Sequence, residues 1–312
     1  MRSQVLDALG SCVRSIIATP ENRTFVVSDL SSIEVWVLGW LTRCEGINRM
    51  AREKRDPYKS FGEVWLGTPY DSINKSVRRL CKPPMLGCGY RLGPGQQVGP
   101  DEFIGLMAYG RSMGIEMSQE QAEHATQVYR EKFFEVVNWW YWWEDAACRT
   151  VLQGSTVEGF GLRFQLEGDF MTILLPSGRK LWYHKPRWEQ VRAPWGDLVW
   201  NFTYMGKHQK TQQWCRLTNH GGRGVEQTTQ GIARDVLVHG MRMFEEKARE
   251  QLGPQEAEIV GHVHDEAIGE TRTQCADQAL SLLDQCLSTT PSWAPGLILG
   301  SEGYVAKRYR KG

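Results

Sequence analysis

Apolar residues follow two different periods along this chain, and the two periods predict two kinds of element. Short apolar runs at 24–28, 258–263 and 267–270 predict strands, the last two joined by a tight turn at 264–266. Apolar residues at helical spacing predict helices at 35–41, 58–66, 72–90, 118–150, 225–251 and 272–288. The region between the predicted helices at 118–150 and 225–251 is rich in β-formers and turns, including 175–179 and 181–183, and predicts hairpins. An irregular basic tail is expected after the final helix.

Composition narrows the class of protein further. The 312 residues are 41% hydrophobic and 23% charged, as in soluble globular proteins. No run of about 18 apolar residues and no signal-peptide pattern is present, so we expect neither a membrane span nor secretion. Eight cysteines are scattered without a CxxC pair or a zinc-ligand spacing, which predicts reduced thiols in a cytoplasmic protein.

Charge and aromatic content leave alternatives open. The net charge of +1 gives no argument from overall basicity, but Lys and Arg gather in three places. The three groups are Lys75, Arg78, Arg79 and Lys82; Arg179, Lys180, Lys185 and Arg187; and Lys307, Arg308, Arg310 and Lys311. Each group is compatible with a solvated face or with a polyanionic partner. Five aromatic residues at 139–143 predict a buried helical anchor, with base stacking as the alternative.

Two segments far apart in the sequence carry carboxylates at strand ends. Asp29 ends the first predicted strand, and Glu34 follows about one helical turn later. Asp265 and Glu266 share a tight turn, where they repel each other unless a cation lies nearby. Taken singly, these are ordinary turn or capping residues. If the strands are neighbours, Asp29 and Asp265 converge, and such pairs suit two Mg²⁺ ions about 3.5–4 Å apart.

A third segment places functional residue types at helical spacing. Arg78, Lys82, Leu86 and Tyr90 are four apart and would form one stripe, with two cations for a triphosphate followed by a surface for a base. A basic surface helix with an apolar stem explains the same pattern. The prolines directly after Lys82 predict that this helix is kinked or restarted there.

In this order, the three segments resemble the motifs of family A DNA polymerases, the DNA polymerase I-like group. Residues 28–34 (SDLSSIE) resemble motif A, 78–90 (RRLCKPPMLGCGY) motif B, and 263–266 (VHDE) motif C. Residues 175–179 (LPSGR), 225–235 (VEQTTQGIARD) and 309–311 (YRK) are most similar to the bacteriophage branch. The resemblance covers nearly the whole chain.

This resemblance implies an α+β fold: a polymerase palm with an antiparallel sheet and helices, and mostly helical fingers. We expect residues 1–48 and 225–312 to form the palm, and 49–224 the fingers with an associated hairpin segment. Only 28 residues precede Asp29, so thumb and exonuclease domains are expected to be absent. The favoured expectation is the C-terminal part of a split or truncated polymerase, with a second polypeptide supplying those domains. A minimal enzyme that binds DNA weakly is the alternative.

The resemblance also implies a catalytic site with two Mg²⁺ ions. Asp29, Asp265 and the backbone carbonyl of Leu30 would hold the metals, and Glu266 would support the site. Lys82 would donate a proton to the pyrophosphate that leaves.

The remaining implied roles concern primer–template DNA and deoxynucleoside triphosphates (dNTPs). Arg78 and Lys82 match the triphosphate-binding pair, and Glu34 matches the steric gate that excludes a ribose 2′-hydroxyl. Tyr90 matches the aromatic residue near the templating base, while Leu86 stands where bacterial enzymes usually carry an aromatic one. The residues expected to contact DNA are His264, Gln230, Arg234 and Arg179.

The resulting hypothesis is a template-directed DNA polymerase core in the cytoplasm of a bacterial host, with no membrane partner. A catalytically idle DNA-binding or assembly subunit derived from a polymerase is one alternative. A single-subunit RNA polymerase is another, although Glu34 argues against it because such enzymes need room for the 2′-hydroxyl.

Overall fold

The computed structural model describes residues 13–193 and 196–310, which fall into two compact units. Unit 1 consists of Met1–Ile33 and Ala233–Gly312, and unit 2 of Glu34–Ile232. Within the described residues, no helix is both long and apolar enough to cross a membrane. The seven cysteines described are all free, as expected, while Cys12 and Lys311 lie outside the described residues.

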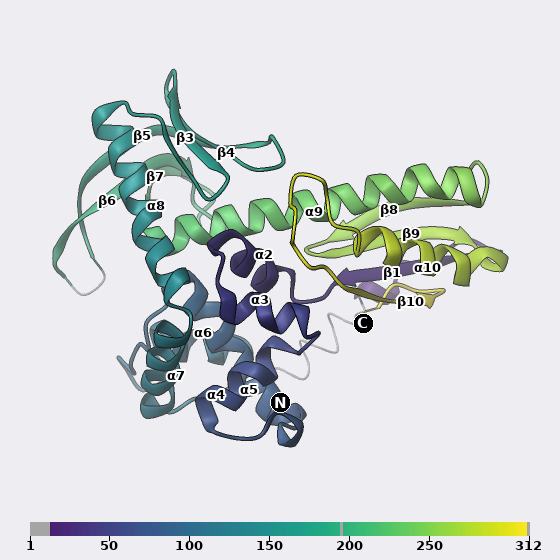
Figure 1. The fold of residues 1–312 in the computed structure, drawn as a ribbon, viewed down its shortest axis with the longest axis horizontal. Helices are drawn as coiled ribbons and strands as arrows, with labels where there is room; N and C mark the ends of the chain where they lie inside the picture. The colour runs from purple at the N-terminus through teal and green to yellow at the C-terminus, as the bar shows by residue number, and fades with distance from the viewer. Residues whose placement is uncertain (1–12, 194–195, 311–312) are drawn as a thin grey trace. The chain divides into compact units, whose positions relative to one another are not determined.

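Unit 1 contains a four-stranded antiparallel sheet with the strand order β10-β1-β9-β8 (Figure 1). Its strands are β1 (Arg23–Leu30), β8 (Ala257–Val263), β9 (Glu266–Arg272) and β10 (Ser301–Ala306). The strands predicted before Asp29 and around Asp265 are therefore present. The expectation of an irregular tail is wrong at residues 301–306, because they pair with residues 25–30 of β1. An edge strand takes its stability from such pairing rather than from its own apolar pattern.

Helix α10 (Ala276–Leu287), preceded by the short η3 (Thr273–Cys275), packs on this sheet against β1 and β10. A small core joins β1 to the chain's end: Phe25, Val27 and Tyr309 are buried together.

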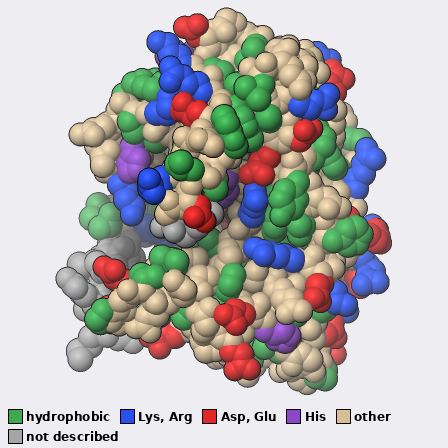
Figure 2. Space-filling view, turned by 90° about the vertical axis from the view of Figure 1, so that its left-hand side faces the viewer, with side chains coloured by type: hydrophobic (Ala, Val, Ile, Leu, Met, Phe, Trp, Pro, Cys, Tyr) green, Lys and Arg blue, Asp and Glu red, His purple; other side chains and the backbone are tan. Residues whose placement is uncertain are grey.

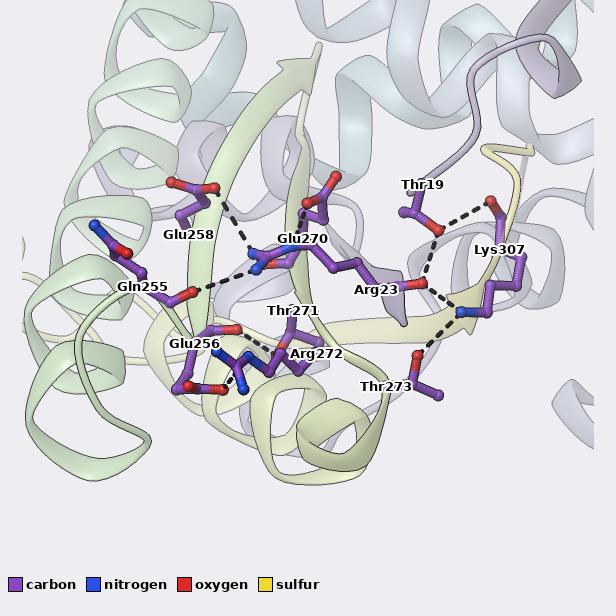
Figure 3. A network of polar contacts seen from close by, with 10 residues as sticks. All are labelled: Thr19, Arg23, Gln255, Glu256, Glu258, Glu270, Thr271, Arg272, Thr273 and Lys307. Carbon is purple, nitrogen blue, oxygen red and sulfur yellow. Dashed lines mark hydrogen bonds and ion pairs between the residues drawn. The ribbon is translucent and has the colours of Figure 1, made fainter. Parts of the chain in front are cut away.

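A polar network holds the strands of this sheet at one end (Figure 3). Arg23 on β1 donates to the Glu270 carboxylate on β9, and its guanidinium lies 3.7 Å from Glu258 on β8. Lys307 donates to the Arg23 carbonyl, and to Thr273 at 3.0 Å. Because one arginine bridges three strands, the order and register of the sheet are tied together at this point.

Unit 2 begins with helices, as the periodicity predicts. They are α2 (Ile33–Thr42, whose first residue belongs to unit 1), α3 (Glu45–Arg52), α4 (Pro57–Leu66), α5 (Lys75–Gly87), α6 (Gly105–Ser112), α7 (Gln119–Lys132) and α8 (Phe134–Gln153), with 3-10 turns η1 (Tyr70–Ser72) and η2 (Cys88–Tyr90). The predicted helix at 118–150 is thus two helices, separated at Phe133.

The predicted interruption after Lys82 is wrong, because α5 runs through Pro83 and Pro84 as one helix. Each proline lacks an amide hydrogen and leaves a carbonyl one turn earlier without its helical donor, at a cost of about 3 kcal/mol. Both rings are buried, as is the neighbouring Met85. Packing of this apolar face therefore offsets the missing hydrogen bonds.

The tryptophan-rich segment of α8 is a buried anchor, as its spacing predicts. Trp139, Trp140 and Trp143 are all buried. The indole nitrogen of Trp140 donates to the Gly89 carbonyl at 2.7 Å, and that of Trp143 to the Thr228 hydroxyl at 3.3 Å. These three rings belong to the core of unit 2 and offer no face for base stacking, whereas Tyr141 in the same run is 55% exposed.

The hairpin segment of unit 2 forms a six-stranded antiparallel sheet with the sequential order β2-β3-β4-β5-β6-β7 (Figure 1). Its strands are β2 (Val157–Gly159), β3 (Leu162–Glu167), β4 (Phe170–Leu174), β5 (Lys180–Arg192), β6 (Leu198–Lys207) and β7 (Trp214–Asn219). The long helix α9 (Gly221–Gln251) follows and continues into unit 1. One face of the sheet is covered by α8, whose Trp143 ring contacts Phe164 and Phe202.

Candidate active site

The two aspartates that lie 236 positions apart in the sequence come together in unit 1. Strands β1 and β9 pair so that Asp29 lies opposite Glu266, the residue that follows Asp265. The backbone amide of Leu30 donates to the Asp265 carbonyl at 3.1 Å. His264 begins the turn between β8 and β9 with a φ of 54°, a left-handed conformation that tight hairpin turns use. The convergence predicted for neighbouring strands is therefore present.

Desolvation and neighbouring carboxylates raise the pKa of Asp29, although the residue is exposed near the end of β1. Desolvation raises its pKa most, and the charges of Asp265, Glu302 and Asp284 raise it further. Glu302 lies opposite Asp29 on β10, just as Glu266 does on β9. Three adjacent strands thus place negative charge at one position of the sheet.

A tyrosine and a serine hold two of the surrounding carboxylates, because the Ser28 hydroxyl donates to Asp284. The Tyr309 hydroxyl donates to Glu266. Burial still raises the pKa of Glu266, aided by Asp29 and Asp265, although the bond from Tyr309 opposes it. Burial and Glu266 together raise the pKa of Tyr309 to about 12, so its hydroxyl stays a donor at neutral pH.

These residues fit a divalent cation that substrate oxygens help to bind. Asp29 and Asp265 lie close enough that each charge disfavours the other, and a cation bound between them would offset this repulsion. Across 13–193 and 196–310, no three or more His, Cys, Asp or Glu residues are arranged to hold a metal by themselves. Mg²⁺ commonly takes only one or two protein carboxylates, together with phosphate oxygens of a substrate. Asp29 and Asp265 would supply the carboxylates.

Unit 2 contains a pocket of about 310 Å³. It is lined by side chains from α2, the end of α5, the loop after it, α6 and the start of α9: Glu34, Gly87, Tyr90, Leu92, Tyr109, His220, Arg223, Glu226 and Gln230. Three of the predicted site residues, Glu34, Tyr90 and Gln230, therefore share one cavity.

Glu34 and Tyr90 are joined directly in this pocket. The Tyr90 hydroxyl donates to Glu34 Oε2 at 3.0 Å. Burial raises the pKa of Tyr90 well above its usual value, and Glu34 adds to the shift. Glu226 faces the same pair, and burial together with the Glu34 charge raises its pKa. The pocket thus combines a carboxylate fixed by a tyrosine with a second carboxylate that is costly to ionise.

Arg78 and Lys82, the predicted triphosphate-binding pair on α5, already have partners. Arg78 Nε donates to Asp56 Oδ2 at 2.7 Å, and its guanidinium lies over the Tyr58 ring. The Lys82 ammonium lies 5.8 Å from the centroid of that ring. Asp56 also caps α4, because it accepts the amides of Tyr58 and Lys59. Leu86 is half-buried on the same helix.

The four residues expected to contact DNA lie in different settings. His264 is exposed in the β8–β9 turn, and Gln230 and Arg234 are exposed one turn apart on α9. Arg179 closes the turn between β4 and β5, and its guanidinium donates to the Gly231 carbonyl at 2.7 Å. A structural contact therefore engages Arg179.

Several residues of both sites were not predicted from the sequence. Tyr309 belongs to a recognised closing segment, but nothing in the sequence connects it to Glu266. Glu302 lies in the region expected to be irregular, and Glu226 lies on the predicted helix at 225–251. Asp56 precedes a proline at a predicted helix start, a pattern that does signal its capping role.

Comparison with known proteins gives curated relatives and structural neighbours, while no protein-family model matches. The chain is 29% identical over 311 residues to the DNA polymerase of Bacillus phage SP02, covering 99% of this chain and 44% of that protein. It is 23% identical over 278 residues to DNA polymerase I of Aquifex aeolicus, covering 89% of this chain and 37% of that protein. A solved structure of the POL domain of Pol1 from M. smegmatis, in complex with DNA primer-template and dNTP, matches with a TM-score of 0.61.

The chain has the fold of a DNA polymerase domain. The structural match covers 96% of this chain and 42% of the other at 16% identity. Together these similarities confirm the resemblance and the fold class predicted from the sequence. The chain spans less than half the length of the curated relatives that it matches.

Proposed function

We propose that this chain catalyses template-directed DNA synthesis, in which a primer 3′-hydroxyl attacks the α-phosphate of a dNTP. A bond forms between the 3′-oxygen and the α-phosphorus, the bond to the β-phosphate oxygen breaks, and pyrophosphate leaves. The observation that carries the proposal is the convergence of Asp29 and Asp265 from opposite ends of the chain, in a fold shared with DNA polymerases.

Asp29 and Asp265 would hold two Mg²⁺ ions, with the Leu30 carbonyl as a further ligand. Bound there, the ions would lower the pKa of the primer hydroxyl and neutralise charge that develops on the triphosphate. Glu266, fixed by Tyr309, would orient this pair rather than bind the metal. His264, exposed in the turn, would contact the primer end.

Unit 2 would select and bind the nucleotide. Arg78 would exchange its bond with Asp56 for the triphosphate, which suits a guanidinium because phosphate offers the same bidentate geometry as a carboxylate. Lys82 would give a proton to the departing pyrophosphate. Glu34, held by Tyr90, would fill the space that a ribose 2′-hydroxyl needs. Leu86 and Tyr90 would contact the base pair.

Template and primer would contact Gln230 and Arg234 on the exposed face of α9. Arg179 would reach DNA only where its bond to Gly231 leaves donors of the guanidinium available. This proposal also includes the assignment of residues 1–48 and 225–312 to the palm, and of residues 49–224 to the fingers.

Extension of a labelled primer–template with Mg²⁺ and dNTPs tests the proposal, with the chain alone and with a candidate second polypeptide. Extension by the wild type and none by Asp265→Ala is expected. Equal extension by both, or none by either in both settings, would contradict it and favour an idle DNA-binding subunit. Replacing dNTPs by ribonucleotides distinguishes an RNA polymerase.

A further inference from the structure

The six-stranded sheet of unit 2 has one face that carries a row of aromatic rings. Trp182 contacts Phe170 with ring centroids 5.5 Å apart, Phe170 contacts His184 at 4.9 Å, and His184 contacts Trp214 at 6.0 Å. The rings come from β4, β5 and β7. Trp182 and Trp214 are 54% and 61% exposed, although tryptophan usually buries most of its surface. We call these four residues the aromatic row.

Strand register shows that the aromatic row lies on the face opposite the core. Phe170 pairs with His184, and Trp214 pairs with Lys207, so the members of each pair share a face. Side chains alternate along β6, which places Lys207 on the face opposite the buried Phe202. On the other face, Phe164 and Phe202 pack on Trp143 of α8. The exposed rings therefore contribute little to the core.

Basic side chains share this face with the aromatic row. By register, it carries five Lys and Arg residues against three Glu: Arg163, Lys180, Arg187, Lys207 and Arg216 against Glu158, Glu167 and Glu189. Arg163 and Lys180 are paired with Glu158 and Glu167, and Glu189 lies 3.8 Å from Arg187 and 3.6 Å from Arg216. Near Trp214, the three cations Arg187, Lys207 and Arg216 thus share Glu189 as a carboxylate, which leaves positive charge beside the rings. In Figure 2, hydrophobic side chains lie next to those of Lys and Arg over the upper part of the visible face.

We propose that the aromatic row binds single-stranded nucleic acid, with bases stacked on its rings and phosphates on the surrounding cations. Exposed rings on an antiparallel sheet, interleaved with Lys and Arg, form the stacking platform that such strands use. A docked protein fits less well, because the centres of protein interfaces are depleted in Lys, whereas Lys180 and Lys207 flank the rings. The inference does not depend on catalysis by the chain.

The matched control lies on the same sheet. Trp200 on β6 is 60% exposed, and by register it projects from the opposite face to Trp214. A Trp200→Ala change therefore removes an equally exposed indole without touching the aromatic row.

Fluorescence anisotropy of a labelled oligodeoxythymidine, measured with the full chain, tests the proposal. The double variant Trp182→Ala/Trp214→Ala should bind at least about tenfold more weakly, because stacking contributes about 1–3 kcal/mol per base. Trp214→Phe should keep most of the affinity, and Trp200→Ala should bind like the wild type. Lys207→Gln should reduce the slope of log affinity against log salt by about 0.7.

Equal affinity of the double variant and the wild type would overturn the proposal and leave a protein as the occupant of this face. An equal loss in Trp200→Ala would overturn it as well. Circular dichroism and thermal unfolding verify that each variant is folded. The assay contains no primer, nucleotide or Mg²⁺, so its result stands apart from that of the primer-extension experiment.

Discussion

The two carboxylate sites of this protein differ in the groups that surround their negative charge. In unit 1, Asp29 lies between Glu266 and Glu302 on the neighbouring strands, and next to Asp265. In unit 2, Glu34 has a fixed donor, the hydroxyl of Tyr90 at 3.0 Å. The first arrangement raises the pKa of its central aspartate, whereas the second fixes the position of its carboxylate.

Under the proposed function, the unit 1 carboxylates form a cation site, and Glu34 with Tyr90 forms a shape site that would exclude a ribose 2′-hydroxyl. Crowded carboxylates are unfavourable until a positive charge arrives, so the unit 1 site gains most when a cation binds. A carboxylate held by a neutral hydroxyl presents the same surface whether or not a ligand is present. The four predictions below test this contrast.

The largest effect is expected at the cation site. Asp265→Asn should reduce primer extension about a thousandfold, because several kcal/mol of charge stabilisation in the transition state are lost. Asp277→Asn, an exposed aspartate in the first turn of α10, is the matched control and should leave the rate unchanged. Single-turnover extension rates measure both. A similar rate for Asp265→Asn and the control would show that the cluster is not catalytic.

The shape site should control the choice of sugar. Glu34→Ala should weaken discrimination against ribonucleotides by roughly a hundredfold, within the range that a few kcal/mol in a pocket provides. Glu34→Gln keeps the bulk and can still accept from Tyr90, so it should retain most of the discrimination. The ratio of kcat/KM for dNTP and ribonucleotide measures this. Equal ratios for the alanine variant and the wild type would remove Glu34 from the specificity pocket.

A stability measurement sharpens the contrast without any substrate. The pKa of Asp29 is raised above its ordinary 3.8, so its favourable contribution is full below that pH and is lost as pH rises through the higher folded value. Asp29→Asn should therefore melt at a higher temperature than the wild type at neutral pH without metal, and the difference should shrink on acidification. Added Mg²⁺ should stabilise the wild type more than the variant. A lower melting temperature for Asp29→Asn at pH 7 would contradict this.

The smallest effect is expected from the hydroxyl that holds Glu34. Tyr90→Phe removes the donor but keeps the ring, so discrimination should fall by about tenfold, as for loss of one hydrogen bond to a charged group. The loss must remain smaller than in Glu34→Ala, since the carboxylate itself is still present. Sugar selectivity of the two variants, measured side by side, checks the order, and a reversed order would show that Tyr90 acts on its own.

Local patterns predicted much of the fold and part of each site. The alternation around Asp29 and Asp265 was enough to predict strands that end there, because side-chain period and turn residues are local properties. The spacing at 139–143 likewise predicted the buried side of α8. For the sites, these patterns indicated Asp29, Asp265, Glu34 and Tyr90 as candidate functional residues. The family resemblance supplied their roles.

The failures share one cause, which is packing between distant segments. Helix α5 continues through Pro83 and Pro84 because its apolar face is buried, whatever the local cost. Residues 301–306 form a strand because β1 offers a free edge, not because their own pattern demands one.

The sequence alone determined which residues could carry charge, stack or turn, since those properties belong to each side chain and its near neighbours. Only the tertiary structure decided that Asp29 and Asp265 meet, that Tyr309 holds Glu266, and that Trp182 and Trp214 share an exposed face. Such meetings depend on strand register and sheet order, which arise from contacts between segments that are distant along the chain.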